Sequence, residues 1–184
     1  VTGAVSYQWS PATGLSCTNC DNPMASPAVT TTYTVTGTSA TGCADTIQVA
    51  VTVHQLPVIS AGQDQEICLG ESVQLQAAGG VSYQWAPATG LSCTSCPNPT
   101  ATPTDTTTYV VIGSSTFGCI GYDTVVVNVK PLPTISAGSN QMICGGDTAQ
   151  LQATGGVSYT WTPSATLSCA ACPDPQATPV TPTT

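Results

Sequence analysis

Three pairs of cysteines, each with two residues between its members, recur along the chain at intervals of 76 residues: Cys17 and Cys20, Cys93 and Cys96, and Cys169 and Cys172. A Cys-x-x-Cys pair can be a redox dithiol, half of a zinc site or a structural disulfide. Redox pairs usually open a helix, whose N-terminus lowers the thiol pKa, whereas these pairs lie in turn-rich segments that continue into Asn-Pro or Asp-Pro. A zinc site would need ligands from two copies. We therefore expect three local disulfides, with no metal and no redox centre.

Acidic residues suggest a second kind of site, because secreted β-repeats often bind calcium through carboxylates. Asp64 and Glu66 lie close together, but Asn140 and Met142 stand at the equivalent positions of the next copy. A calcium site that served every repeat would keep its ligands. We therefore expect solvated surface acids at these positions.

Catalysis would need groups that this chain does not repeat. The single histidine, His54, is replaced by Lys130 in the next copy, so a histidine-based site cannot recur. The sequence also lacks a glycine-rich phosphate loop, a nucleophile elbow and a recurring carboxylate pair. We expect no enzyme active site and no cofactor in this segment.

An aromatic pair recurs on segments that have the pattern of strands: Tyr7 and Trp9, Tyr83 and Trp85, and Tyr159 and Trp161. Exposed rings of this kind could form a sugar-binding platform. However, Tyr83 and Trp85 alternate with polar residues and share one strand face with Val81. We therefore expect the aromatic pairs to belong to the core.

Composition limits the partners of the chain. Its 184 residues include 9 Asp+Glu and 1 Lys+Arg, which gives a net charge of −8. One lysine cannot neutralise a phosphate backbone, so nucleic-acid binding and docking to anionic membranes are excluded. No apolar run approaches the roughly 20 residues that span a bilayer. The 10 cysteines, an even number, indicate disulfides and hence an oxidising, extracellular compartment.

The segments that carry these residues are copies of one unit. VSYQWSPATGLSCTNC at Val5 recurs as VSYQWAPATGLSCTSC at Val81 and as VSYTWTPSATLSCAAC at Val157, without insertion or deletion. Proline-containing linkers end at Pro57 and Pro133. We predict a partial first repeat over residues 1–54, a complete central repeat over residues 55–130 and a partial third repeat over residues 131–184. Because both ends fall inside a repeat, we expect a slice of a longer repetitive chain.

Alternating apolar residues predict strands throughout the central repeat. Three alternate valines keep their identity between copies while the residues between them change, namely Val49, Val51 and Val53, matched by Val125, Val127 and Val129. We expect this set to face inward. About seven short strands in a unit of 76 residues predict a small all-β sandwich of two sheets, with Trp85 on the third strand.

The combined pattern resembles a known family. ICLGESVQLQAAGG, VSYQWAPATGLSC, TTTY and a Gly-Cys followed by a valine-alternating strand are similar to the immunoglobulin-like or PKD-like repeats of very large surface proteins of Bacteroidota. Those proteins include gliding-motility adhesins and other proteins exported by type IX secretion. The resemblance covers the whole chain and implies tandem immunoglobulin-like sandwiches at the cell surface, with a role in adhesion.

Four further cysteines need partners: Cys43, Cys68, Cys119 and Cys144. The sequence allows a Cys68–Cys119 bond within one repeat, the bonds Cys43–Cys68 and Cys119–Cys144 across the linkers, or bonds to cysteines outside the chain. A disulfide needs Cα atoms about 4.4–6.8 Å apart, and the first turn and last hairpin of an immunoglobulin topology lie at opposite poles. This argument favours bonds between repeats or chains but does not choose among them.

Asp-Thr dipeptides resemble the O-glycosylation motif of exported Bacteroidota proteins. They place candidate acceptors at Thr46, Thr106, Thr124 and Thr148. Such dipeptides also arise by chance in a threonine-rich β protein, so both interpretations stay open. No Asn-x-Ser/Thr acceptor occurs, and N-glycosylation is not expected.

Together these patterns predict a structural and adhesive role. Tandem disulfide-bonded sandwiches would form a stalk or filament whose partners are neighbouring repeats, identical chains or surface glycans. A sandwich of this size is marginally stable alone, and each cross-link would stabilise it by about 2–4 kcal/mol. The alternatives are an array of carbohydrate-binding modules and a spacer in a secreted multidomain enzyme.

Overall fold

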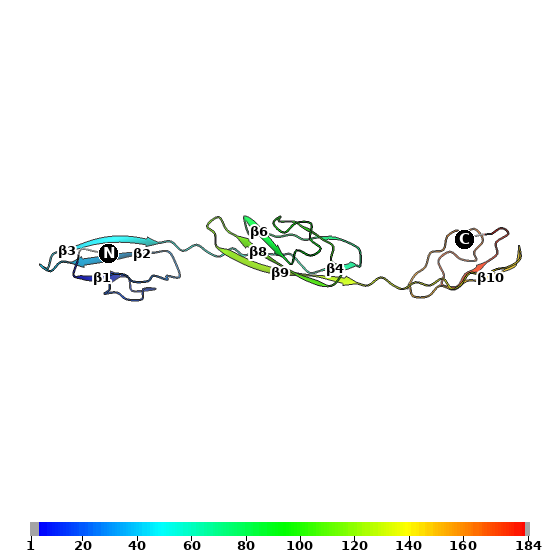
Figure 1. The fold of residues 1–184 in the computed structure, drawn as a ribbon, viewed down its shortest axis with the longest axis horizontal. Coiled ribbons are helices and arrows are strands. Elements are labelled where there is room, and N and C mark those ends of the chain that lie inside the picture. Colours follow the sequence, from blue (N-terminus) through cyan, green and yellow to red (C-terminus); the bar gives the residue numbers. More distant parts are fainter. Residues whose placement is uncertain (1–3, 183–184) are drawn as a thin grey trace. The chain divides into compact units, whose positions relative to one another are not determined.

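The structure, a computed structural model, describes residues 4–182 of the chain (Figure 1). The first repeat contains β1 (Ser6–Ser10), β2 (Thr31–Thr38) and β3 (Ala44–Val51). The central repeat contains β4 (Gln65–Cys68), β5 (Val73–Gln74), β6 (Ser82–Ala86), β7 (Thr100–Ala101), β8 (Thr107–Ser114) and β9 (Ile120–Lys130). The third repeat contains β10 (Ala149–Gln150) and β11 (Gln176–Ala177). The predicted all-β fold is confirmed for this part of the chain.

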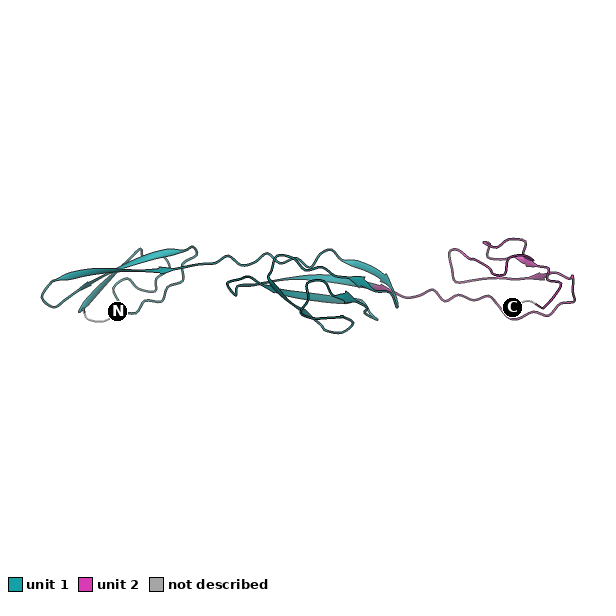
Figure 2. Ribbon diagram, turned by 90° about the horizontal axis from the view of Figure 1, so that it is seen from above, with its two compact units in different colours: residues 1–128 teal, residues 129–184 magenta. Residues whose placement is uncertain are grey.

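The chain divides into two compact units, residues 1–128 and 129–184 (Figure 2). The first unit holds both the first repeat and nearly all of the central repeat, so the predicted boundary after residue 54 stays a prediction. The division at residue 128 falls inside β9, two residues before the predicted end of the central repeat. Within residues 4–182, no helix has the length and apolar character needed to cross a membrane.

The central repeat is a sandwich of two sheets. One sheet has the order β4-β9-β8-β6, and the other pairs β5 with β7. Residues 57–64, which precede β4, are called the first segment. A bridge between Ser60 and Ala78 joins this segment to the chain that follows β5, so the first segment contacts both sheets. In an immunoglobulin domain the C, F and G strands share one sheet and the B and E strands belong to the other. The strands β6, β8 and β9 and the pair β5 and β7 follow that arrangement, which makes the fold immunoglobulin-like.

The core of the central repeat is built from alternate residues of the long strands, each at most 1% exposed: Trp85, Tyr109, Val111, Val125 and Val127. Trp85 lies opposite Val111, and Tyr109 lies opposite Val125. The predicted inward orientation of Val125 and Val127 is confirmed. The Tyr109 hydroxyl donates to the Thr89 carbonyl at 2.9 Å, and burial raises the pKa of this hydroxyl.

Two expectations about the core are wrong. Val49 is 48% exposed, because the described residues of the first repeat form the sheet β1-β2-β3 and no strand equivalent to β4 or β5 covers it there. Val81 is 64% exposed, although alternation predicts that it shares the buried face of Trp85. Val81 precedes β6 at the end of the sheet. There the Ile59 side chain packs against Gly80 and occupies the buried position beside the strand.

Candidate functional site

The three Cys-x-x-Cys pairs are disulfide-bonded, and each is hydrogen-bonded to the tryptophan of its repeat. The Cα atoms of the pairs lie 6.0, 6.0 and 5.9 Å apart, for Cys17–Cys20, Cys93–Cys96 and Cys169–Cys172. The indole N–H donates to the carbonyl of the second cysteine at 2.9, 3.0 and 2.9 Å, in Trp9–Cys20, Trp85–Cys96 and Trp161–Cys172. The loop thus satisfies the one polar atom of a core tryptophan, a link that alternation in the sequence could not reveal.

Opening the central disulfide is expected to destabilise the central repeat. In the variant Cys93→Ser/Cys96→Ser the unfolded chain regains the freedom that a four-residue loop removes, which costs about 2 kcal/mol. Urea unfolding of the variant and the parent chain measures the loss. The exposed thiol Cys68 offers the control Cys68→Ser, for which we expect no change. Equal midpoints for the double variant and the parent would contradict a stabilising role of the disulfide.

The aromatic pairs lie in or beside the core of their repeats. Trp9 and Trp85 are buried, whereas Tyr7, Tyr83, Tyr159 and Trp161 are half-buried. The Tyr83 hydroxyl accepts a hydrogen bond from the Gly80 N–H at 3.0 Å and donates one to the Gly80 carbonyl at 2.8 Å. Tyr159 makes the same pair of bonds with Gly156. The tyrosines therefore fix the turn before their strand. Trp85, at 1% exposure, has no open face for a sugar ring.

Cys43, Cys68 and Cys144 are exposed thiols, and Cys119 is a half-buried thiol. Their positions follow from a segment that runs beside β9. The Ala61 N–H donates to Asp123 Oδ2 at 2.8 Å, and the Val126 N–H donates to Asp64 Oδ1 at 2.8 Å. Both contacts join residues 62 apart in the sequence, so the first segment and β9 run in the same direction.

This parallel course separates Cys68 from Cys119. Since β4 neighbours β9, the same offset of 62 residues places Cys68 at the Lys130 end of β9, whereas Cys119 immediately precedes the strand. The 11 residues of β9 span roughly 36 Å at about 3.3 Å per residue. A disulfide bridges Cα atoms no more than about 6.8 Å apart. The geometry therefore excludes a Cys68–Cys119 bond within one repeat.

Cys119 lies instead against the linker that enters the central repeat. Its thiol donates to the His54 carbonyl, with sulfur and oxygen 3.9 Å apart. The His54 ring stacks on Phe117, with ring centroids 3.6 Å apart and an interplanar angle of 7°. Phe117 and Cys119 belong to the turn between β8 and β9. The turn between β8 and β9 of the central repeat is thus a docking surface for the linker before it.

The Asp123 carboxylate holds the first segment in place, and stability should depend on its charge. The N–H groups of Ala61 and, less strongly, Thr124 keep the pKa of Asp123 below its ordinary value. A depressed pKa contributes stability above the unfolded pKa of about 3.9, and this contribution is lost as the pH falls through the folded pKa. We expect Asp123→Asn to be less stable than the parent at pH 7 and to lose less stability on acidification. Urea midpoints between about pH 7 and 3 test this, with the exposed Asp174→Asn as control. Parallel midpoint curves for parent and variant would contradict it.

The remaining predicted sites lie on the surface. Thr46, Thr106, Thr124 and Thr148 are all exposed, and their glycosylation stays a prediction. Asp64, considered as a calcium ligand, instead accepts the Val126 N–H. The described residues contain no group of three or more His, Cys, Asp or Glu that could hold a metal ion.

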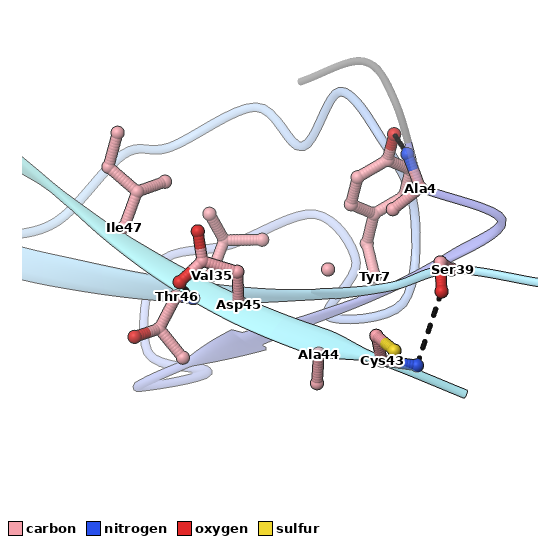
Figure 3. Close-up of a pocket in the computed structure, with 10 residues that line it drawn as sticks. Ala4, Tyr7, Val35, Ser39, Cys43, Ala44, Asp45, Thr46 and Ile47 are labelled. Carbon is pink, nitrogen blue, oxygen red and sulfur yellow. Dashed lines mark hydrogen bonds between the residues drawn. The ribbon is translucent and has the colours of Figure 1, made fainter. Parts of the chain in front are cut away.

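A cavity of about 420 Å³ opens on the first repeat, lined by Tyr7, Gly37 and Ile47 among others (Figure 3). Its counterpart in the central repeat is filled. Gly113, the equivalent of Gly37, contacts the Ile59 side chain so closely that a Cβ there would collide with it. The cavity therefore lies at the position that the first segment fills in the central repeat.

Comparison with known proteins gives likeness at the level of fold alone. No family model and no curated protein matches the sequence. Among solved structures, Sidekick-1 immunoglobulin domains 1–4 are 16% identical, with a TM-score of 0.38, and the match covers 96% of this chain and 60% of that chain. Extracellular domains 3–5 of Drosophila OTK are 10% identical, with a TM-score of 0.37 and coverage of 80% and 61%. Protocadherin Gamma B7 cadherin domains 1–4 are 13% identical, with a TM-score of 0.36 and coverage of 94% and 58%. The chain spans about three fifths of each of these structures. The immunoglobulin-like description rests on the strand order given above.

Proposed function

We propose that this chain is a structural repeat segment of a long extracellular protein, which forms a stalk or filament at the cell surface and serves adhesion. The observation that carries the proposal is the way successive repeats are built to join. Each repeat closes its own disulfide, and its tryptophan donates to the carbonyl of the second cysteine. The linker residue His54 docks on the β8–β9 turn of the repeat that follows. Repeats joined in this way would keep their order along the chain and carry mechanical force along its length.

The surface chemistry supports a mechanical role over recognition of an anionic ligand. The chain carries 1 Lys+Arg, and the threonine-rich outer faces of its strands offer hydroxyl groups for lateral contact or for glycans. The resemblance to surface repeats of Bacteroidota extends the proposal to a gliding or attachment adhesin exported by type IX secretion, glycosylated at its Asp-Thr sites.

A carbohydrate-binding array would need an exposed aromatic residue in every copy. The exposed rings of the central repeat are Phe117 and Tyr122, at 66% and 76% exposure. Threonine stands at both equivalent positions of the first repeat, Thr41 and Thr46. No aromatic platform therefore repeats, and the array is the weaker alternative.

Surface labelling of the source cells tests the proposed function. Antibodies raised against the chain should label intact cells along surface structures, and deletion of the repeats from the parent gene should reduce attachment to a solid surface. A matched control removes one whole repeat, residues 55–130, which joins residues 54 and 131 in the repeat's own phase and should preserve surface labelling. Labelling confined to permeabilised cells would overturn the proposal, as would recovery of the chain only in a soluble secreted enzyme.

A further inference from the structure

The repeat brings two different cysteines to the same linker position. At the entry to the central repeat, the hairpin cysteine Cys119 contacts the carbonyl of linker residue His54. At the exit, the first-strand cysteine Cys68 lies beside the end of β9, where the sequence reaches Lys130. Lys130 is the linker residue equivalent to His54. Repeats built alike would therefore bring two cysteines to each linker residue: the first-strand cysteine of the repeat that it leaves and the hairpin cysteine of the repeat that it enters.

We propose that successive repeats are joined by a disulfide between the first-strand cysteine of one repeat and the hairpin cysteine of the next. Cys68 would bond to the hairpin cysteine of the third repeat, and Cys119 to the first-strand cysteine of the repeat before it. This inference rests on the proposed function, because the bond needs an extracellular, oxidising setting. Each junction would then have two covalent connections, the backbone linker and the disulfide, and the stalk would resist bending at its joints.

The pairing also accounts for all four thiols. A shift of 76 residues places the partner of Cys119 before residue 1 and the partner of Cys68 after residue 184, and the same holds for Cys43 and Cys144. The structure has Cys43, Cys68, Cys119 and Cys144 as thiols, which agrees with this pairing.

The chemistry is an ordinary thiol oxidation. Two thiols form one sulfur–sulfur bond and release two protons and two electrons, which reduce a disulfide oxidant such as glutathione disulfide to its two thiols. Cys68 is exposed and belongs to β4, the edge strand of its sheet. Its sulfur is therefore accessible to that exchange.

An extended chain tests the bond directly. Residue 184 occupies the repeat position of Thr108, so a second copy of residues 109–130 added after Thr184 completes the third repeat and supplies its hairpin cysteine. After oxidation with glutathione disulfide, acid quenching and peptic digestion, mass spectrometry should find Cys68 linked to the added cysteine. Cys43, Cys119 and Cys144 should remain thiols. One matched control replaces the added cysteine by serine, and the other carries Cys68→Ser. In both controls the number of free thiols should be the same before and after oxidation.

Several results would overturn the proposal. A Cys68–Cys119 or Cys43–Cys68 peptide would do so, as would disulfide-linked dimers in place of the internal bond. Cys68 left as a thiol while the three Cys-x-x-Cys pairs close would do so as well, since those closed pairs report that the chain has folded. If the extension does not fold, peptide mapping of the native surface protein decides the question through the partner of Cys119. Surface labelling of cells does not depend on this bond, so failure of the two proposals can be told apart.

Discussion

Replacement of Trp85 by alanine is expected to remove most of the stability of the central repeat. Trp85 is 1% exposed, and its indole N–H donates to the Cys96 carbonyl at 3.0 Å. Loss of a buried tryptophan costs about 3–5 kcal/mol, whereas a domain of 76 residues has a total stability of about 4–11 kcal/mol. The substitution also leaves the Cys96 carbonyl without its donor. We therefore expect the strands β6, β8 and β9 to open frequently in the native state.

Hydrogen exchange resolved to peptides measures this opening, because it separates the central repeat from the other two. Amides of β8 and β9 should lose protection by several orders of magnitude in Trp85→Ala, while those of the third repeat keep theirs. The matched control is Trp161→Ala, since Trp161 is the equivalent residue but is only half-buried, and its loss should cost less. Trp85→Phe retains most of the apolar volume and should fall between the parent and the alanine variant. Unchanged protection in β8 and β9 would show that the tryptophan does not anchor the sandwich.

Features carried by local pattern were predictable from the sequence. The turn-rich setting of the Cys-x-x-Cys pairs predicted local disulfides, and in the structure all three pairs are bonded. Alternation predicted the strands and the inward orientation of Val125 and Val127. In each case the information lies within a few consecutive residues, or in the 76-residue repeat that places them in register.

Features that depend on a partner strand were not predictable in the same way. Val49 and Val125 occupy equivalent positions with the same alternation, yet they are 48% and 1% exposed. Burial requires an opposing sheet, and the described residues of the first repeat form the sheet β1-β2-β3 without one. The positions of Cys68 and Cys119 at opposite ends of β9 depend on the parallel course of the first segment, which two hydrogen bonds to aspartates establish and no periodicity encodes.

Packing of the first segment against the neighbouring strands links the fold to the joints between repeats. Its residues pack where side chains are missing on the neighbouring strands: a Cβ on Gly121 would collide with the Pro57 carbonyl, and one on Gly113 would collide with Ile59. The same segment carries the linker past Cys119 and leads to Cys68. Any change that unseats it should therefore weaken both the sandwich and the connection to the preceding repeat.

Gly79→Ala is expected to unseat this segment at a cost of more than about 3 kcal/mol. Gly79 has φ of +90°, and a Cβ there would collide with the carbonyl of Val58. Positive φ alone costs an L-residue about 1–2 kcal/mol. The collision adds to this, because the two backbones cannot separate without breaking the paired bonds of Ser60 and Ala78, at 3.0 and 2.9 Å.

Gly70→Ala is the matched control, since Gly70 has φ of +93° but a Cβ there would meet no atom within 4 Å. It should cost only about 1–2 kcal/mol from the backbone conformation. Urea midpoints give the two losses, and exchange of the Ser60 and Ala78 amides shows whether the first segment detaches in Gly79→Ala alone. Gly155 faces the Thr134 carbonyl in the same way, so Gly155→Ala should reproduce the larger loss in the third repeat. Equal losses for Gly79→Ala and Gly70→Ala would mean that backbone strain accounts for both, and that close contact with the first segment contributes nothing.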